Sequence, residues 1–171
     1  METMVNIQDI ARYTILRLIQ NGNTICPLKL QKVLYYMQAW HMVYFGRENT
    51  LFKDIPEAWV NGPVYKVVYD KYKTIPMYEQ IQLSFLGLNA HDEFTNEVKR
   101  LYTKLNLSDR QYEFVESILR HYGSMSHDKL VFLTHSQRPW NDARVGLQPF
   151  EYTDQKISLD NMCEYYSKSV K

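Results

Sequence analysis

The segment from residue 28 to residue 46, LKLQKVLYYMQAWHMVYFG, is the feature that most restricts the fold of this chain. Its main apolar residues recur at helical spacing, and these are Leu30, Val33, Leu34, Met37, Trp40 or His41, and Tyr44. Gly46 follows at the position where a helix commonly ends. Tyr35 and Tyr36 lie beside this stripe and widen it, as is typical of a helix that packs on more than one side. We therefore expect a central helix that organises the core.

Helical patterns also occur on both sides of this segment. Asn6 is a candidate N-cap for a first helix that Gly22 ends. Ser108 and Gln111 have the spacing of a capping box, for a helix that runs through Tyr122. Further helices are expected over residues 94–105, around residues 130–133, and after an N-cap at Ser158. Helices therefore account for most of the expected regular structure.

Residues 51–65, LFKDIPEAWVNGPVY, indicate extended segments that are interrupted by a turn. Asn61, Gly62 and Pro63 are the clearest turn residues in the chain. Pro63 is also expected to lie in the first turn of a short helix that carries residues 64–68. Residues 75–90 allow either a short strand or a loop.

The predicted fold is a mainly α (α+β) protein, a compact multi-helix fold with a small antiparallel β element. A length of 171 residues suits one domain. Since the sequence contains no internal repeat and no Pro/Gly-rich linker, we expect a single domain over residues 1–171.

The composition excludes several classes of protein. Twenty Lys and Arg residues against 19 Asp and Glu residues give a net charge of +1, so bulk charge does not favour nucleic acid as a partner. The N-terminus lacks the pattern of a signal peptide, and no apolar run is long enough to span a membrane. Two distant cysteines, Cys26 and Cys163, suit a reducing compartment. We therefore expect a cytoplasmic protein without a membrane partner.

The sequence contains no recognisable pattern for catalysis, metal binding or cofactor binding. The five histidines lack zinc-helix spacing, no GxSxG elbow is present, and the glycines do not form a phosphate loop. We accordingly predict no catalytic, metal-binding or cofactor-binding residues, no small-molecule substrate and no enzyme activity. One alternative is a small acid/base site formed by His135, Asp142 and Arg144. A second is a nucleic-acid rim on the first two helices, formed by Arg12, Arg17, Lys29 and Lys32, although a solvated rim is favoured.

The 14 tyrosines suit either a core with some polar groups or a recognition surface. Two clusters combine tryptophan, proline and ionisable side chains, EAWVNGPVY at residues 57–65 and HSQRPWNDAR at residues 135–144. Three blocks, two of which contain these clusters, resemble the family of SocA-like antitoxins with a Panacea domain, which includes GepA-type phage-associated proteins. They are LKLQKVLYYMQAWH at residues 28–41, LFKDIPEAWVNGPVYKVVYDKYK at residues 51–73 and LTHSQRPWNDAR at residues 133–144. The blocks occur in the order of that family and span most of the chain.

This resemblance implies an antitoxin of a toxin–antitoxin system that neutralises a cognate toxin by direct protein–protein binding. The toxin is expected to be encoded next to the antitoxin. In some branches of the family the antitoxin delivers the toxin to a cellular protease instead, and this route is the alternative.

Six residues that match or adjoin these motifs are expected to face outward and contact the partner. They are Lys32, Tyr36, Gln38, Trp59, Asn61 and Arg144. A surface that meets different toxins in different relatives should vary, so three positions outside the motifs are also candidates, namely Tyr78, Phe85 and Tyr112.

Overall fold

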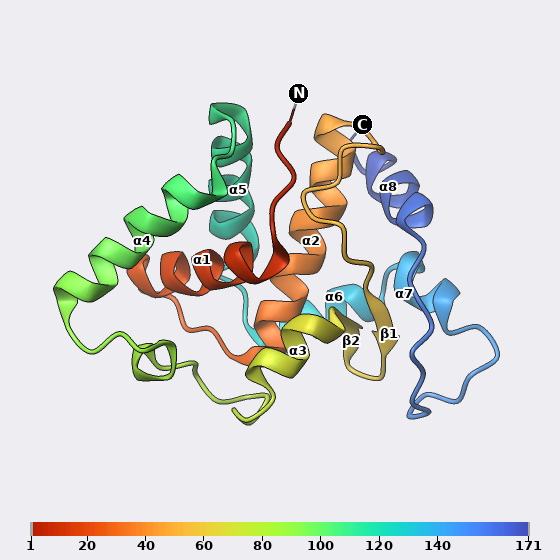
Figure 1. Cartoon of the computed structure of the whole chain (residues 1–171). Helices are drawn as coiled ribbons and strands as arrows, with labels where there is room; N and C mark the ends of the chain where they lie inside the picture. The colour runs from red at the N-terminus through yellow and green to blue at the C-terminus, as the bar shows by residue number, and fades with distance from the viewer. Residues whose placement is uncertain (1, 171) are drawn as a thin grey trace.

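The central helix of the molecule is α2 (Pro27–Phe45), as predicted (Figure 1). The computed structural model describes residues 2–170. Fourteen of the 19 residues of α2 are buried, because helices α1 (Ile7–Gln20), α5 (Asp109–Tyr122), α6 (His127–His135) and α8 (Leu159–Ser167) all pack against it. Helix α4 (His91–Leu105) packs on α1 at one end of the molecule (Figure 1). The mainly helical fold class is thereby confirmed.

The predicted helix ends are confirmed where side chains cap the backbone. Asn6 Oδ1 accepts a hydrogen bond from the backbone N–H of Gln8 (2.8 Å) at the start of α1. Ser108 and Gln111 form the capping box of α5, and Ser158 caps α8. These caps satisfy N–H groups that have no partner within their own helix.

The β element is a hairpin of β1 (Glu57–Trp59) and β2 (Gly62–Val64). Glu57 pairs with Val64, and Trp59 pairs with Gly62. The expectation that Pro63 begins a helix is wrong, since Pro63 lies within β2 and the short helix α3 (Lys66–Tyr72) begins three residues later. The Gln31 side chain binds the backbone of Tyr65 between the two elements, which keeps residue 65 out of the helix.

The chain near residue 156 lies along the outer edge of β1. The backbone N–H of Ala58 donates to the carbonyl of Gln155, and that of Ile157 donates to the carbonyl of Pro56, both at 2.8 Å. These bonds supply partners to the outer edge of the hairpin and bring the C-terminal part of the chain next to Trp59.

Residues 75–90 form turns and one 3₁₀ helix (Leu83–Leu86), without a strand. Ile81 and Leu86 are buried and hold this segment to the core. A further short helix, α7 (Arg138–Ala143), has Pro139 in its first turn and packs against α6 and α8.

Many of the tyrosines form a core with internal hydrogen bonds. The rings of Tyr36 and Tyr122 stack with centroids 4.2 Å apart. The hydroxyls of Tyr36 and Tyr166 both donate to Gln137 Oε1, at 2.7 and 2.6 Å. Burial raises the pKa of both hydroxyls, because an ionised phenolate is poorly solvated there. Much of the tyrosine surplus therefore serves the interior.

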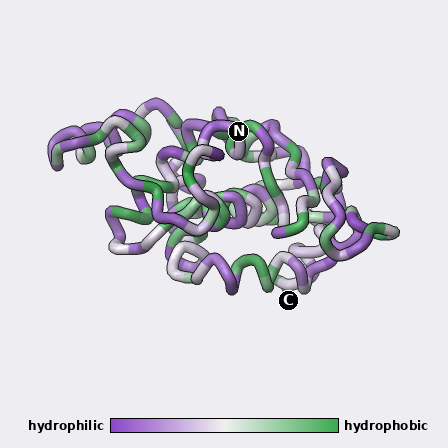
Figure 2. The backbone as a smooth tube through the Cα atoms, turned by 90° about the horizontal axis from the view of Figure 1, so that it is seen from below, coloured by the Kyte–Doolittle hydropathy of each residue, from purple (hydrophilic) through white to green (hydrophobic). Residues whose placement is uncertain are grey.

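No helix among residues 2–170 is long and apolar enough to cross a membrane. Hydrophilic and hydrophobic positions are mixed along the whole trace in Figure 2.

Candidate functional site

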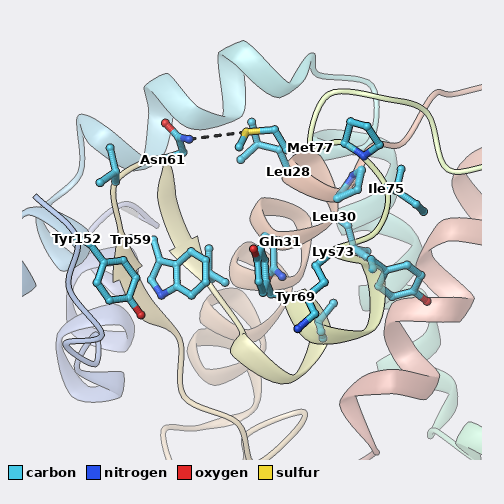
Figure 3. A pocket seen from close by; sticks show the side chains of 16 residues that line it. Leu28, Leu30, Gln31, Trp59, Asn61, Tyr69, Lys73, Ile75, Met77 and Tyr152 are labelled. Atoms are coloured by element: carbon cyan, nitrogen blue, oxygen red, sulfur yellow. Dashed lines mark hydrogen bonds between the residues drawn. The ribbon is translucent and has the colours of Figure 1, made fainter. Parts of the chain in front are cut away.

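A pocket of about 300 Å³ opens beside the hairpin (Figure 3). Its walls come from the first turns of α2, from the hairpin, from α3 and from the segment that follows α3. The lining residues are mostly apolar or aromatic, and they include Leu28, Leu30, Trp59, Val68, Tyr69, Ile75 and Met77, with Tyr152 from the segment before α8. Concave apolar surfaces with a few polar groups are the usual form of binding sites.

Three aromatic rings form one rim of this pocket. Trp59 makes edge-on contacts with Tyr69 and Tyr152, with ring centroids 4.8 and 5.6 Å away. The indole N–H of Trp59 donates to Glu57 Oε1 (2.8 Å), and Lys156 binds the other carboxylate oxygen of Glu57. Trp59 is therefore held in position while Tyr69 and Tyr152 remain exposed.

The lining also includes the amides of Gln31 and Asn61 and the ammonium group of Lys73. Asn61 lies in the hairpin turn, and its Nδ2 is 3.8 Å from the sulfur of Met77 (Figure 3). Lys73 lies just after α3 and is the one lining residue with a formal charge at neutral pH. Trp59 and Asn61 are thus the two predicted contact residues that the structure places at this site.

The two glutamines of α2 hold backbone segments instead of facing solvent. Gln31 accepts from the N–H of Tyr65 (2.8 Å) and donates to its carbonyl (3.3 Å). Gln38 accepts from the N–H of Leu51 (2.7 Å) and donates to the carbonyl of Phe52 (2.6 Å). Each amide thereby pairs with a main-chain N–H and a main-chain carbonyl, as an adjacent strand would. The expectation that Gln38 faces outward is wrong, because its side chain is buried.

Lys32 is also buried, directly beneath the hairpin. Its Nζ donates to the carbonyl of Pro63 (3.0 Å). Burial lowers the pKa of Lys32 to about 7, and the nearby Cys26 offsets this effect only in part. Gly62 lies so close that a Cβ there would be 2.6 Å from Lys32 Cε. The lysine of the first motif and the glycine of the second are therefore packed against each other, and Lys32 is not an outward contact.

Arg144 crosslinks the loop that precedes α8 to the hairpin. Its guanidinium donates to the carbonyls of Ala58 (2.7 Å), Gln148 (3.2 Å) and Glu151 (2.6 Å), and it packs on the ring of Trp140. Because all of these acceptors are main-chain groups and Arg144 is 7% exposed, the expectation that it faces outward is wrong.

Two aromatic candidates are also buried. Tyr36 lies in the tyrosine core, and Tyr112 stacks on Tyr102 with centroids 4.0 Å apart. Tyr78 and Phe85, by contrast, are exposed. Aromatic content alone did not separate these cases, because a tyrosine serves a hydrogen-bonded core and a surface equally well.

The sequence did not identify most residues of the pocket lining as contacts, including Tyr69, Lys73, Met77 and Tyr152. Tyr69 and Lys73 are four residues apart in KVVYDKYK, a spacing that puts two side chains on one face of a helix, and this signal was available. Tyr152 had no such signal, since its place beside Trp59 depends on the pairing of residues 155–157 with β1.

The alternative acid/base site is not assembled. His135 stacks on Trp140 with centroids 4.0 Å apart. Asp142 instead contacts Arg138 and the amide of Asn161. Among residues 2–170, no hydrogen bond joins His135, Asp142 and Arg144, and no group of three metal-ligating side chains occurs.

The alternative nucleic-acid rim on the first two helices is not a free cationic surface. The favoured interpretation, a solvated rim, is also wrong for Lys29 and Lys32, which are buried. Lys29 is buried and donates to the carbonyls of Thr24 and Gly123. Arg12 and Arg17 form ion pairs with Glu97 and Glu116. The cations of this region are therefore engaged within the protein.

A family model described as "Antitoxin SocA-like, Panacea domain" matches residues 30–141, which is more than half of the chain. The match extends from α2 through the hairpin and α3 into α7, and it includes most of the pocket wall. No curated protein and no solved structure matches the chain.

Proposed function

This chain belongs to the SocA-like antitoxin family with a Panacea domain, and from that membership we propose that it neutralises a cognate toxin by binding it directly. The expected toxin is the product of a neighbouring gene, and both proteins act in the cytoplasm. The protein works by occupying a surface of the toxin, without enzyme activity of its own.

The observation that supports this proposal best is the exposed aromatic rim of the pocket. Tyr69 and Tyr152 remain open to solvent beside the fixed ring of Trp59. Tryptophan and tyrosine supply much of the energy of protein–protein interfaces when they lie near the centre of the contact. With the surrounding surface, this pocket would form the centre of an interface of about 1,200–2,000 Å².

Of the six residues predicted from the motifs, Trp59 and Asn61 remain proposed contacts. Lys32, Tyr36, Gln38 and Arg144 are not proposed as contacts, because they are buried and their polar atoms bind other parts of the chain. Because these buried residues hold the fold and the rim is on the surface, relatives could recognise different toxins through changes in the rim alone.

Co-expression with the product of the neighbouring gene tests the proposal. The neighbour alone should stop growth, the pair should grow, and the two proteins should co-elute in size-exclusion chromatography. A neighbour that is harmless alone, or a pair that neither grows nor co-elutes, would refute neutralisation.

The amount of toxin distinguishes direct blocking from delivery to a protease. In direct blocking, the level of the toxin after translation is halted should be unchanged by this protein. A toxin that disappears faster in its presence would contradict simple occupancy and favour the delivery route.

A further inference from the structure

We propose that the pocket beside the hairpin binds a segment of the toxin in which an apolar side chain is followed closely by an acidic residue. The apolar side chain enters the pocket, and the carboxylate pairs with Lys73. This inference rests on the proposed function and adds to it the chemistry of the recognised segment.

The charge of the pocket favours an acidic partner. None of the 16 lining residues is acidic, and Lys73 is the one with a formal charge. In Figure 3 its side chain extends along the pocket near Tyr69. A carboxylate bound here would be shielded from water on the side of the aromatic rim, which strengthens its attraction to an ammonium group.

The ammonium group of Lys73 is available for such a contact. Its nearest acid is Asp70, at 3.6 Å. Asp70 is already bound by Lys66, which donates to both of its oxygens at 2.7 and 2.9 Å. The side chain of Lys73 is also 53% exposed. Moving toward a ligand would therefore cost Lys73 only a long, exposed ion pair.

The helix beside the pocket adds to this positive charge. Residues 66–73 carry Lys66, Lys71 and Lys73 against the single acid Asp70. This net positive charge around the pocket would attract an acidic segment and repel a basic one.

The volume of the pocket suits a side chain of a protein. An apolar cavity of about 150 Å³ holds one benzene molecule, so a pocket of about 300 Å³ has room for one large aromatic or aliphatic side chain and part of its neighbour. Asn61 at the opening has only a weak contact with the sulfur of Met77, and its amide can bind the backbone of the entering segment.

A set of short peptides tests this chemistry directly. The probes are acetyl-Gly-Phe-Leu-Glu-Gly-amide and its analogues with Gln or Lys in place of Glu, each titrated into the whole ¹⁵N-labelled protein. The Glu peptide should shift the indole N–H signal of Trp59 and leave in place that of Trp40, which lies outside the pocket lining. It should bind at least fivefold more tightly than the Gln peptide, and the Lys peptide should bind least.

Matched lysine variants assign the preference to the pocket. Lys73→Gln should remove the difference between the Glu and Gln peptides, while Lys71→Gln, which removes the same charge from a residue outside the lining, should retain it. Absence of any shift at Trp59, equal affinity for all three peptides, or an unchanged preference in Lys73→Gln would overturn the proposal.

The toxin itself separates failure of this inference from failure of the proposed function. In the co-expression assay, Lys73→Glu should weaken rescue of growth by the antitoxin far more than Lys71→Glu. If wild type rescues growth and both variants rescue equally, the pocket chemistry is refuted and neutralisation stands. If wild type itself neither binds nor rescues, neutralisation is refuted.

Discussion

The two sides of the hairpin differ in how they use polar and aromatic residues. Lys32 and Arg144, neither of which lines the pocket, bind main-chain carbonyls of the hairpin, those of Pro63 and Ala58. Toward the pocket, the same hairpin presents Trp59 beside the exposed ring of Tyr152. The buried Lys32 and Arg144 thus form a frame that holds the hairpin in place. Residues outside the motifs, such as Tyr152, form much of the exposed surface.

The frame is costly to change because its polar atoms are buried. A buried hydrogen-bonding group that loses its partner costs about 1–3 kcal/mol, and a charged one costs more. Tyr69 and Tyr152 in the rim lack this constraint, because both side chains are exposed. Substitutions on the two sides should therefore differ in their effect on the free energy of unfolding, and the predictions below are ordered by that effect.

Lys32→Met is expected to have the largest effect on the free energy of unfolding. Unlike most core substitutions, it should gain stability relative to wild type as the pH falls. The native pKa of Lys32 is about 7, against 10.5 for an unburied lysine. As the pH falls from 10.5 to 7, the unfolded chain binds a proton that the native protein does not, so this lysine progressively destabilises the wild type. The stability of Lys32→Met relative to wild type should rise by about 4 kcal/mol over this range, at 1.36 kcal/mol per pKa unit.

Urea unfolding at several pH values measures this difference. Lys71→Met is the matched control, because it makes the same substitution at an exposed position of α3. The ionisable neighbours that influence Lys32 and its surroundings are Cys26 and His135. If the difference in free energy of unfolding between wild type and Lys32→Met stays constant from pH 10.5 to 7, Lys32 keeps its proton in the folded protein.

Arg144→Ala should lower the free energy of unfolding by about 3 kcal/mol, since it leaves three carbonyls without their charged donor. Arg138→Ala removes an arginine from the neighbouring helix, where the side chain is 70% exposed and pairs with Asp142. Its loss should cost less than about 0.5 kcal/mol. Equal effects of the two substitutions in urea unfolding would contradict a framework role for Arg144.

Gly62→Ala should destabilise the protein by about 2 kcal/mol. Gly62 has a φ of 110°, and an added Cβ would be 2.6 Å from Lys32 Cε and 2.9 Å from Thr134 Oγ1. Gly87→Ala is the control, because its φ of 76° is also positive but nothing lies within 4 Å. Backbone strain alone should then cost about 1 kcal/mol there. The two variants should differ in thermal unfolding, and identical midpoints would mean that the contact with Lys32 is not tight.

The sequence predicted the helices and their caps well because those signals are local. Asn6, Ser108 and Ser158 cap helices through bonds to residues two or three positions away. The burial of Lys32 and Arg144 could not be predicted in this way. Their partners, Pro63 and Ala58, are distant in sequence, and a lysine or arginine is normally exposed.

The sequence identified only some of the residues at the pocket as contacts, for the same reason. Trp59 and Asn61 stood out because they lie in a motif with evident turn residues. Tyr152 belongs to no motif, and it reaches Trp59 because residues 155–157 pair with β1. A pattern within one segment cannot show which distant segment lies beside it.

The smallest effect on stability, with the largest expected effect on toxin binding, belongs to Tyr152→Ala. Tyr152 is 62% exposed, so its loss should change the free energy of unfolding by less than about 0.5 kcal/mol. It should nevertheless weaken binding to the toxin at least tenfold, which corresponds to about 1.4 kcal/mol, because an aromatic ring at the centre of an interface excludes water from the contact.

Phe132→Ala is the matched control for this variant, since Phe132 is 70% exposed and lies outside the pocket lining. It should leave both unfolding and toxin binding near the wild-type values. Isothermal titration calorimetry with the purified toxin measures the binding of both variants. If Tyr152→Ala and Phe132→Ala bind the toxin equally well, the rim is not the contact surface. The structural role of the buried residues would be unaffected by that result.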